Sequence, residues 1–466
     1  MGLERLVIPC FAALAACTSI HPDLRYVEDA THVRTADVAT DVDPSVPREA
    51  KDLLAKPLDA DAAVRIALLD NRELRATLRE MGVARGQLVQ ASVLPNPVVE
   101  VEALPERTSN FELRAEYDVT GLVLAPIRAR AAAPELDAAR YRAAAAVVDT
   151  GFHARAAYFR ALAAREKLAL ANRSLDALAA ARDAADALFR AGNVSELDFA
   201  TQDAAYQEAR ASTAEMELAA ADAREALVRA LGLHGVDTTF SFAKSQPSVP
   251  ESLAAADDLE TRVLRASFDL KARKSHLEAL GRQAGLSRAE GWLPDVAADV
   301  HALQGERDPT TGAVTSSAWA VSGGVRLSVP IFDRKQGTSA VLDSEVGAGL
   351  ERYVGAAADL RSRTRAAYAR LVTAHAKAKQ YERVIVPARR RVVDQALLQY
   401  NAMQMSFFQL LALKREQLAS ELAAVDAVCN YRIARAAFDA LLSGGDTDDL
   451  PANKPSAATT GVSGGE

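Results

Sequence analysis

A strict two-residue alternation over 111–119 is the strongest constraint on how this chain can fold. The odd positions are apolar or aromatic: Phe111, Leu113, Ala115, Tyr117 and Val119. The even positions are all charged: Glu112, Arg114, Glu116 and Asp118. Because successive side chains of a strand point to opposite faces, the pattern predicts a strand with one apolar and one aqueous face.

The residues before this segment supply a partner strand. Val99 and Val101 alternate with Glu100 and Glu102. A helical pattern from about 59 to 92 stops at Leu94-Pro95-Asn96-Pro97, because proline ends a helix and favours extended chain. Residues 105–110 contain turn-forming types. We therefore expect a β-hairpin with strands at about 97–104 and 111–119.

The same plan recurs in the second half of the chain. Trp292-Leu293-Pro294-Asp295 echoes Val93-Leu94-Pro95-Asn96, and alternating segments follow at about 295–304 and 319–329. Pro330-Ile331 ends the last strand as Pro126-Ile127 ends the corresponding stretch of the first half. Repetition at a fixed spacing indicates an internal duplication, with copies at 57–250 and 251–443.

Long helical runs are expected to fill the remainder of each copy. The chain is rich in alanine, aromatics are 5% and charged residues 25%, a composition that favours long helices in tight contact. The run from about 129 to 189 would be about 90 Å long as a helix. Breaks at about 190–195 and 401–406 predict helical tips. The predicted fold class is therefore mainly α with a smaller β portion.

Four amphipathic strands cannot close a membrane sheet by themselves. In a bilayer an open sheet edge leaves backbone groups unpaired, at a cost of several kcal/mol each. A membrane barrel needs about eight strands or more. If these strands span a membrane, several chains must therefore contribute to one barrel, and three copies would supply about twelve strands.

The N-terminus has the features of a secreted lipoprotein. Residues 1–16 have the length and apolar character of a signal peptide. Leu14-Ala15-Ala16-Cys17 resembles the bacterial lipobox, which implies a covalent lipid on Cys17, and Thr18 in place of Asp implies sorting to the outer membrane. Residues 17–56 are expected to be an extended lead-in, and 444–466 a disordered tail.

The chain resembles the TolC-like outer-membrane efflux family over roughly 57–443. The resemblance rests on the duplicated plan, the two proline-containing helix ends, Val325 to Asp333 (VRLSVPIFD) and Ala191-Gly192-Asn193-Val194-Ser195. It implies a homotrimer with a twelve-stranded β-barrel in the outer membrane and an α-barrel across the periplasm. It also implies a passive duct without enzyme activity, served by a periplasmic adaptor and an inner-membrane pump.

This resemblance assigns roles to particular residues. Strand residues such as Phe111, Leu113, Trp319 and Val321 should meet lipid. The lumen-facing charges would be Glu100, Glu102, Glu112, Arg114, Glu116, Asp118, Asp299 and Arg326, with His301 beside them. The adaptor-contacting tips would be Gly192, Asn193, Val194 and Ser195, and Met403, Gln404, Met405 and Ser406. An acidic mouth should favour cations, although a solvated charged face without selectivity is the alternative.

The second tip departs from the family pattern. Met403 stands where the first tip has Gly192, and no acidic residue lies between Tyr400 and Lys414, so no acidic gate is carried over. Met403 and Met405 could bind Cu(I) or Ag(I), because thioethers suit soft ions. The alternative is adaptor contact or helix packing by flexible methionines. No metal site or cofactor other than the covalent lipid is predicted.

Other classes of protein fit the sequence less well. The chain has no Gly-rich phosphate loop, His-Glu-x-x-His or Cys-x-x-Cys motif, so an enzyme is disfavoured. A formal charge of −7 without a basic patch argues against nucleic-acid binding. A periplasmic adaptor or a coiled-coil scaffold lipoprotein remains the alternative function, but an adaptor would have one helical hairpin and more strands.

Overall fold

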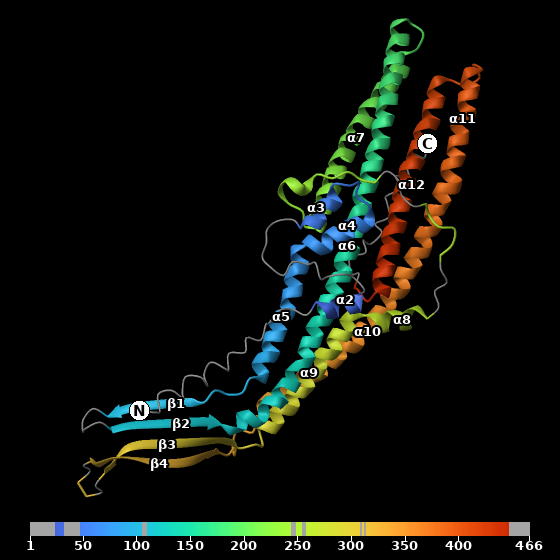
Figure 1. Ribbon diagram of the computed structural model, residues 1–466. Coiled ribbons are helices and arrows are strands. Elements are labelled where there is room, and N and C mark those ends of the chain that lie inside the picture. The colour runs from blue at the N-terminus through green and yellow to red at the C-terminus, as the bar shows by residue number, and fades with distance from the viewer. Residues whose placement is uncertain are drawn as a thin grey trace, which may run out of the picture. The chain divides into compact units, whose positions relative to one another are not determined.

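The computed structural model describes residues 24–31, 47–104, 110–243, 248–253, 258–307, 310–311 and 314–446. Within these residues the chain is mainly helical, with one four-stranded sheet (Figure 1). The predicted fold class, mainly α with four strands per chain, is confirmed. Cys17 and most of the N-terminal segment and tail lie outside the described residues.

Both halves of the chain contain the same series of elements. The first half comprises α2 (Arg25–Thr31), α3 (Arg48–Leu54), α4 (Ala60–Asp70), α5 (Arg72–Ser92), β1 (Val98–Leu104), β2 (Asn110–Asp118), α6 (Val119–Arg190), α7 (Glu196–Leu231) and η1 (Gly235–Thr238). The second half comprises α8 (Leu259–Ala266), α9 (Phe268–Glu290), β3 (Asp295–Arg307), β4 (Val314–Ser328), α10 (Gln336–Gln380), the π-helical turn η2 (Tyr381–Ile385), α11 (Val386–Asn401) and α12 (Phe407–Leu442). The order from α4 to α7 thus recurs from α8 to α12.

The four strands lie side by side in the order β1-β2-β3-β4, and every neighbouring pair is antiparallel (Figure 1). Strands β3 and β4 are longer than the predicted 295–304 and 319–329. Their pairing continues through Glu306↔Ser316 and Arg307↔Val314, across two shifts of register. Such bulges break the two-residue alternation, which is why the sequence pattern missed these strand ends.

Helix α6 begins earlier than the sequence pattern indicated. The prediction that Pro126 ends extended chain is wrong, because α6 starts at Val119 and contains Pro126 and Pro134. Asp118 Oδ1 accepts a hydrogen bond from Gly121 N at 2.6 Å and so supports the helix start. Thr120 Oγ1 also bonds Val296 N at 2.7 Å. These contacts stabilise the start of α6, in a helix where each interior proline costs about 3 kcal/mol.

The first helical run of each repeat is broken in two. A continuous helix was predicted over about 59–92, but α4 ends before Asn71; in the second repeat α8 likewise ends before Ser267. Both residues have extended ψ angles, 118° and 116°. Asn71 Oδ1 accepts from Leu74 N at 3.0 Å, so it acts as an N-cap for α5.

A glycine with a left-handed backbone conformation packs against the chain at each of these two helix breaks. Gly232 (φ 80°) follows α7, and a Cβ there would lie 2.6 Å from the Asp70 carbonyl oxygen. Gly444 (φ 91°) follows α12, and a Cβ there would lie 2.5 Å from the Ala266 oxygen. Only glycine combines this backbone with this approach. The prediction of a disordered tail from 444 is therefore wrong for 444–446, where Asp446 N also donates to Asp149.

The prediction of an extended lead-in over 17–56 is also wrong where the structure describes it. Tyr26 of α2 packs edge-on against Tyr141, with ring centroids 5.8 Å apart. Ala50 of α3 is fully buried, and Glu49 pairs with Arg65 at 2.8 Å. These long-range contacts give two short helices a surface to fold on, which local sequence cannot reveal.

The contact pattern divides the chain into two compact units. One holds the sheet and comprises the described residues within Met1–Tyr26, Thr77–Ala143 and Leu270–Ala356. The other holds the helical tips and comprises the described residues within Val27–Ala76, Ala144–Asp269 and Ala357–Glu466. The core of this second unit joins α4, α6 and α7 through Ile66, Leu69, Tyr158, Leu227 and Leu231.

A second cluster in the tip-bearing unit joins α6 to α12. It consists of Phe152, Ala156, Ile433, Ala436, Ala437 and Ala440. The small alanine side chains let the two helix backbones approach closely, as the alanine-rich composition indicated. Among the described helices, none contains a stretch apolar enough to cross a membrane.

Candidate functional site: the sheet faces and the helical tips

Strand register places all eight predicted lumen-facing charges on one face of the sheet. Glu100 lies opposite Arg114, and Glu102 lies opposite Glu112. Glu116 lies opposite Asp299, and Asp118 opposite Ala297, which pairs in turn with Arg326. Directly paired residues of neighbouring strands share a face, so six carboxylates and two arginines form one continuous surface, here called the charged face.

Salt bridges neutralise part of the charged face. Arg326 bonds Glu116, and Arg114 Nη1 lies 3.9 Å from Glu100 Oε2. His301, opposite Arg114, brings Nε2 to 2.5 Å from Glu112 Oε1, a pair that neutralises Glu112 only when the imidazole is protonated. Among the described residues, Glu102, Asp118 and Asp299 have no ion-pair partner. Asp118 accepts a hydrogen bond from the Gly121 amide, so Glu102 and Asp299 are the two carboxylates of the charged face that neither an ion pair nor a helix cap compensates.

Asp118 has a structural role that the sequence pattern did not indicate. Its carboxylate bonds the Gly121 amide at the start of α6. A carboxylate at a helix N-terminus also interacts favourably with the helix dipole. Asp118 lies on the charged face, but its capping role means that its substitution would disturb the strand–helix junction as well as the charge.

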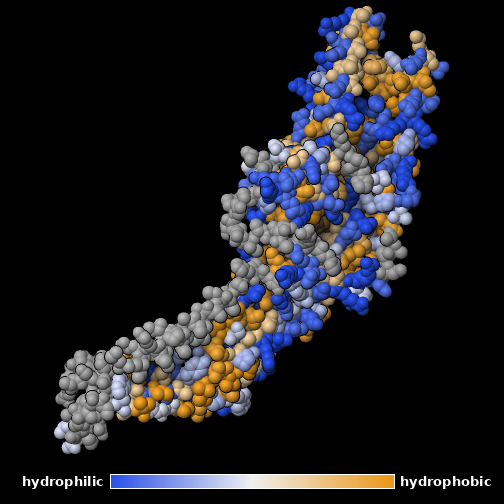
Figure 2. Space-filling view, in the orientation of Figure 1, coloured by the Kyte–Doolittle hydropathy of each residue, from blue (hydrophilic) through white to orange (hydrophobic). Residues whose placement is uncertain are grey.

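The opposite face of the sheet is apolar and exposed. Val321 and Val325 on β4 are 70% and 73% exposed, and Trp319 is 53% exposed. Leu113 on β2 and Val101 on β1 are exposed as well, whereas the side chain of Phe111 lies outside the described set. Figure 2 shows hydrophobic side chains gathered where β3 and β4 lie. An exposed apolar surface of this size favours contact with lipid or another apolar partner.

The two helical tips have the same backbone construction. After α6, Gly192 N bonds Phe189 O at 2.9 Å and Asn193 N bonds Leu188 O at 2.9 Å. After α11, Met403 N bonds Tyr400 O at 2.9 Å and Gln404 N bonds Gln399 O at 2.8 Å. Each pair of bonds is a Schellman motif, which satisfies the last carbonyls of a helix. The two tips, which correspond in sequence, therefore also have the same backbone hydrogen bonds.

Each tip also begins the next helix with a capping box. Ser195 accepts from Asp198 N, and the Asp198 side chain accepts from Ser195 N. Ser406 and Gln409 make the equivalent pair at the second tip. These reciprocal bonds satisfy two amides that would otherwise lack partners at each helix start. Both tips are thus well-formed, exposed turns suited to contact another protein.

The second tip differs from the first in one exposed side chain. Met403 has φ 59°, the left-handed conformation that Gly192 has at 74°, and its side chain is 95% exposed. Met405 is half-buried. Ring pairs brace both tips, with Phe189 stacked on Phe199 at 5.5 Å and Tyr400 against Phe407 at 6.1 Å.

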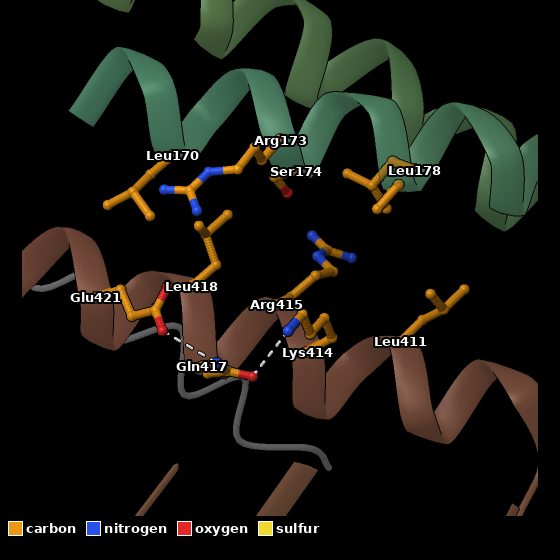
Figure 3. A pocket seen from close by; sticks show the side chains of 11 residues that line it. Leu170, Arg173, Ser174, Leu178, Leu411, Lys414, Arg415, Gln417, Leu418 and Glu421 are labelled. Atoms are coloured by element: carbon orange, nitrogen blue, oxygen red, sulfur yellow. Dashed lines mark hydrogen bonds between the residues drawn. The ribbon is translucent and has the colours of Figure 1, made fainter. Parts of the chain in front are cut away.

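A cationic pocket between α6 and α12 was not predicted from the sequence (Figure 3). Its volume is about 160 Å³, and Arg173, Lys414 and Arg415 line it. Lys414 Nζ donates to Gln417 Oε1 at 3.0 Å, and Gln417 Nε2 donates to Glu421 Oε1 at 3.0 Å. The three- and four-residue spacing of the lining positions was visible in the sequence, but the pairing of the two helices was not.

Cys429 lies on α12, and its thiol has low reactivity. Burial, together with the nearby Asp426 carboxylate, raises the pKa of its thiol to about 11. Its Sγ donates to the Phe159 carbonyl oxygen at 3.5 Å. Across the described parts of the chain, no group of three or more His, Cys, Asp and Glu residues is arranged to hold a metal ion.

Comparison with known proteins gives consistent matches. Residues 126–233 match the family described as "Outer membrane efflux protein". The chain is 26% identical over 393 residues to the cobalt-zinc-cadmium resistance protein CzcC of Cupriavidus metallidurans, covering 82% of this chain and 88% of that protein.

Solved structures extend the similarity to the fold. The outer-membrane channel OprN matches with a TM-score of 0.67 at 21% identity, covering 90% of this chain and 96% of OprN. The Campylobacter jejuni outer membrane channel CmeC matches with a TM-score of 0.65 at 17% identity, covering 88% and 92%. The similarity in fold thus covers most of this chain and most of each channel.

Proposed function

This chain belongs to the TolC-like family of outer-membrane efflux proteins, and on that premise we propose that it is the channel subunit of a tripartite efflux system. The observation that carries the proposal is the sheet, which has one charged face and one exposed apolar face. Lipid on the apolar side and water on the charged side would satisfy both. The matches to channel proteins favour this function over an adaptor or a scaffold.

Three copies would complete the barrel. Within the described chain β1 and β4 are the edge strands of the sheet, and each has one backbone edge to offer a neighbour. A twelve-stranded barrel formed by three chains would pair β4 of each copy with β1 of the next. The long helices would continue the same duct through the periplasm.

Disulfide trapping tests this arrangement. Cysteines introduced at Val99 on β1 and Val325 on β4, both on the apolar face, should cross-link different copies upon oxidation. Scanning one partner by two-residue steps allows for an unknown register. Covalent dimers and trimers on a denaturing gel are expected, whereas each single variant should give none. A protein that stays monomeric in detergent and never cross-links between copies would contradict the proposal.

The duct would be passive and anchored by lipid. The lipobox at Leu14 to Cys17 supports lipidation of Cys17, with sorting to the outer membrane. The inner-membrane pump would supply the energy, and the exposed tips at 190–195 and 401–406 would meet the periplasmic adaptor. Labelled palmitate should enter the wild-type chain and not Cys17→Ser, and cross-linkers placed at Asn193 or Gln404 should capture the adaptor.

Divalent metal ions are the cargo that we propose. The relative at 26% identity is named for cobalt, zinc and cadmium resistance. A lumen bearing the free carboxylates of Glu102 and Asp299 would attract cations. Deleting the gene should lower tolerance to these three metals and raise their cellular content, with tolerance to hydrophobic dyes unchanged. The reverse pattern would assign the duct to organic cargo.

A further inference from the structure

The junction where the sheet meets α9 and α10 projects large apolar side chains into solvent. This junction, defined here as 291–294 together with 329–335, holds Trp292 at 74% exposure and Phe332 at 91% exposure. Ile331 beside them is exposed as well. Tryptophan is enriched where a membrane meets water, because its ring is amphipathic.

Local hydrogen bonds hold the junction in one conformation. Gln336 Oε1 accepts from Arg334 N at 2.7 Å, and Gln336 Nε2 donates to Phe332 O at 3.1 Å. Asp333 Oδ1 accepts from Lys335 N at 2.9 Å, and Lys335 has φ 57°. Phe332 is thus presented by an ordered loop.

Two uncompensated cations lie beside these aromatic side chains. The Arg334 guanidinium carbon is 5.0 Å from the centre of the Trp292 ring. Among the described residues neither Arg334 nor Lys335 has a carboxylate partner, whereas Arg288 of the same unit pairs with Asp343. An anion would pair with Arg334 and Lys335. An anion attached to an apolar chain would also contact the exposed apolar side chains of the junction.

We propose that the junction binds the phosphate headgroup of an anionic phospholipid at the periplasmic boundary of the membrane. Arg334 and Lys335 bind the phosphate, while Trp292, Ile331 and Phe332 contact the upper acyl chain. The proposal rests on the proposed function, because it requires the sheet to be in a bilayer. A second copy of the chain fits less well, since it would have to bring an acidic group to the same apolar patch.

The chain contains two tryptophans, which makes the test specific. Trp319→Phe leaves Trp292 as the junction probe, and Trp292→Phe leaves Trp319 on the apolar face. Each variant is purified as the full-length oligomer and reconstituted in vesicles of phosphatidylcholine with added phosphatidylglycerol. Quenching by lipids brominated at shallow or deep acyl positions then reports the depth of each ring.

Shallow-brominated lipid should quench Trp292 best, and brominated phosphatidylglycerol should do so better than brominated phosphatidylcholine. Replacing Arg334 and Lys335 by Gln in the Trp319→Phe background should lower that lipid preference by roughly fivefold per charge removed. Arg352→Gln in the same background is the matched control. It removes an exposed charge about 24 Å further along α10 and should leave the preference unchanged.

The outcomes separate the two proposals. Quenching of Trp319 by lipid without quenching of Trp292 overturns the headgroup site and leaves the channel function intact. A Trp292 that neither brominated lipid nor aqueous acrylamide quenches would lie between subunits, which also overturns the site. Absence of lipid quenching at both tryptophans contradicts the membrane sheet itself, and with it the proposed function.

Discussion

At the scale of single residues, equivalent positions in the two repeats have the same backbone and different side chains. Gly192 and Met403 are both left-handed, and both donate to the carbonyl three residues earlier. Glycine adopts this conformation freely, whereas methionine is destabilised in it by about 1–2 kcal/mol. The backbone of the second tip is therefore the more strained of the two. This cost suggests that the exposed Met403 side chain has a function.

Exchanging these residues should change the stability of the tips in opposite directions. Met403→Gly should slow hydrogen exchange of the Met403-tip amides roughly fivefold, and Gly192→Ala should speed exchange at the first tip by a similar factor. Gly347→Ala is the control. Gly347 lies in the interior of α10 with open space around it, so alanine should stabilise that helix. Faster exchange in Met403→Gly would refute the strain argument.

At the scale of elements, the segment between the repeats braces a π-helical turn. Val386 N bonds Tyr381 O across η2, and Pro387 follows directly in α11. A proline in a regular α-helix would clash with the carbonyl four residues earlier, and the wider π turn relieves this clash. Glu251 binds Lys379 at 2.8 Å and also Arg383 within the turn, and His375 bonds the Pro250 oxygen.

This brace should open in acid. Hydrogen bonds from Lys379 and Arg383 lower the pKa of Glu251 from 4.5 to about 2. Because the pKa is lower in the folded state, the stabilisation is complete above about pH 4.5 and is lost as the pH falls towards 2. Protease accessibility of the 248–253 segment should rise in that range in wild type. In Glu251→Gln it should be high already at neutral pH, and a flat wild-type profile would contradict the brace.

At the scale of the whole molecule, function depends on a surface that no single strand forms. The charged face combines residues of β1, β2, β3 and β4, and the two carboxylates that neither an ion pair nor a helix cap compensates, Glu102 and Asp299, lie on β1 and β3. One chain provides only a third of the proposed barrel wall. Charge in the lumen would therefore be repeated in each copy, so a single substitution changes three sites at once.

Conductance in planar bilayers should follow this charge. The double variant Glu102→Gln and Asp299→Asn should lower the cation-to-anion permeability ratio by about twofold to fivefold, since charges about 4 Å from an ion in water contribute up to about 1 kcal/mol. Arg326→Gln, which frees Glu116, should raise the ratio. Equal ratios in all three proteins would mean that the charged face is solvated and unselective.

Much of this architecture could be predicted from local pattern. The apolar and charged faces of β2 and the helix caps at Ser195 and Ser406 depend on residues a few positions apart. Short stretches of sequence therefore determine their geometry. The duplication needed only comparison of the chain with itself. The charged face required one further assumption, that neighbouring strands pair in the register that joins like faces.

The remaining features depend on contacts between distant segments. Pro126 lies within a helix because Asp118 and Thr120 anchor its start, and α3 folds because Ala50 reaches a core built by α4, α6 and α7. Glu251 gains its role only when α10 lies beside it. Local propensities amount to tenths of a kcal/mol per residue, so a few such contacts outweigh them. The sequence by itself therefore determines the strand alternation and the helix caps. The helix breaks, the contacts of Glu251 and the loop between the sheet and α10 are decided only by the tertiary structure.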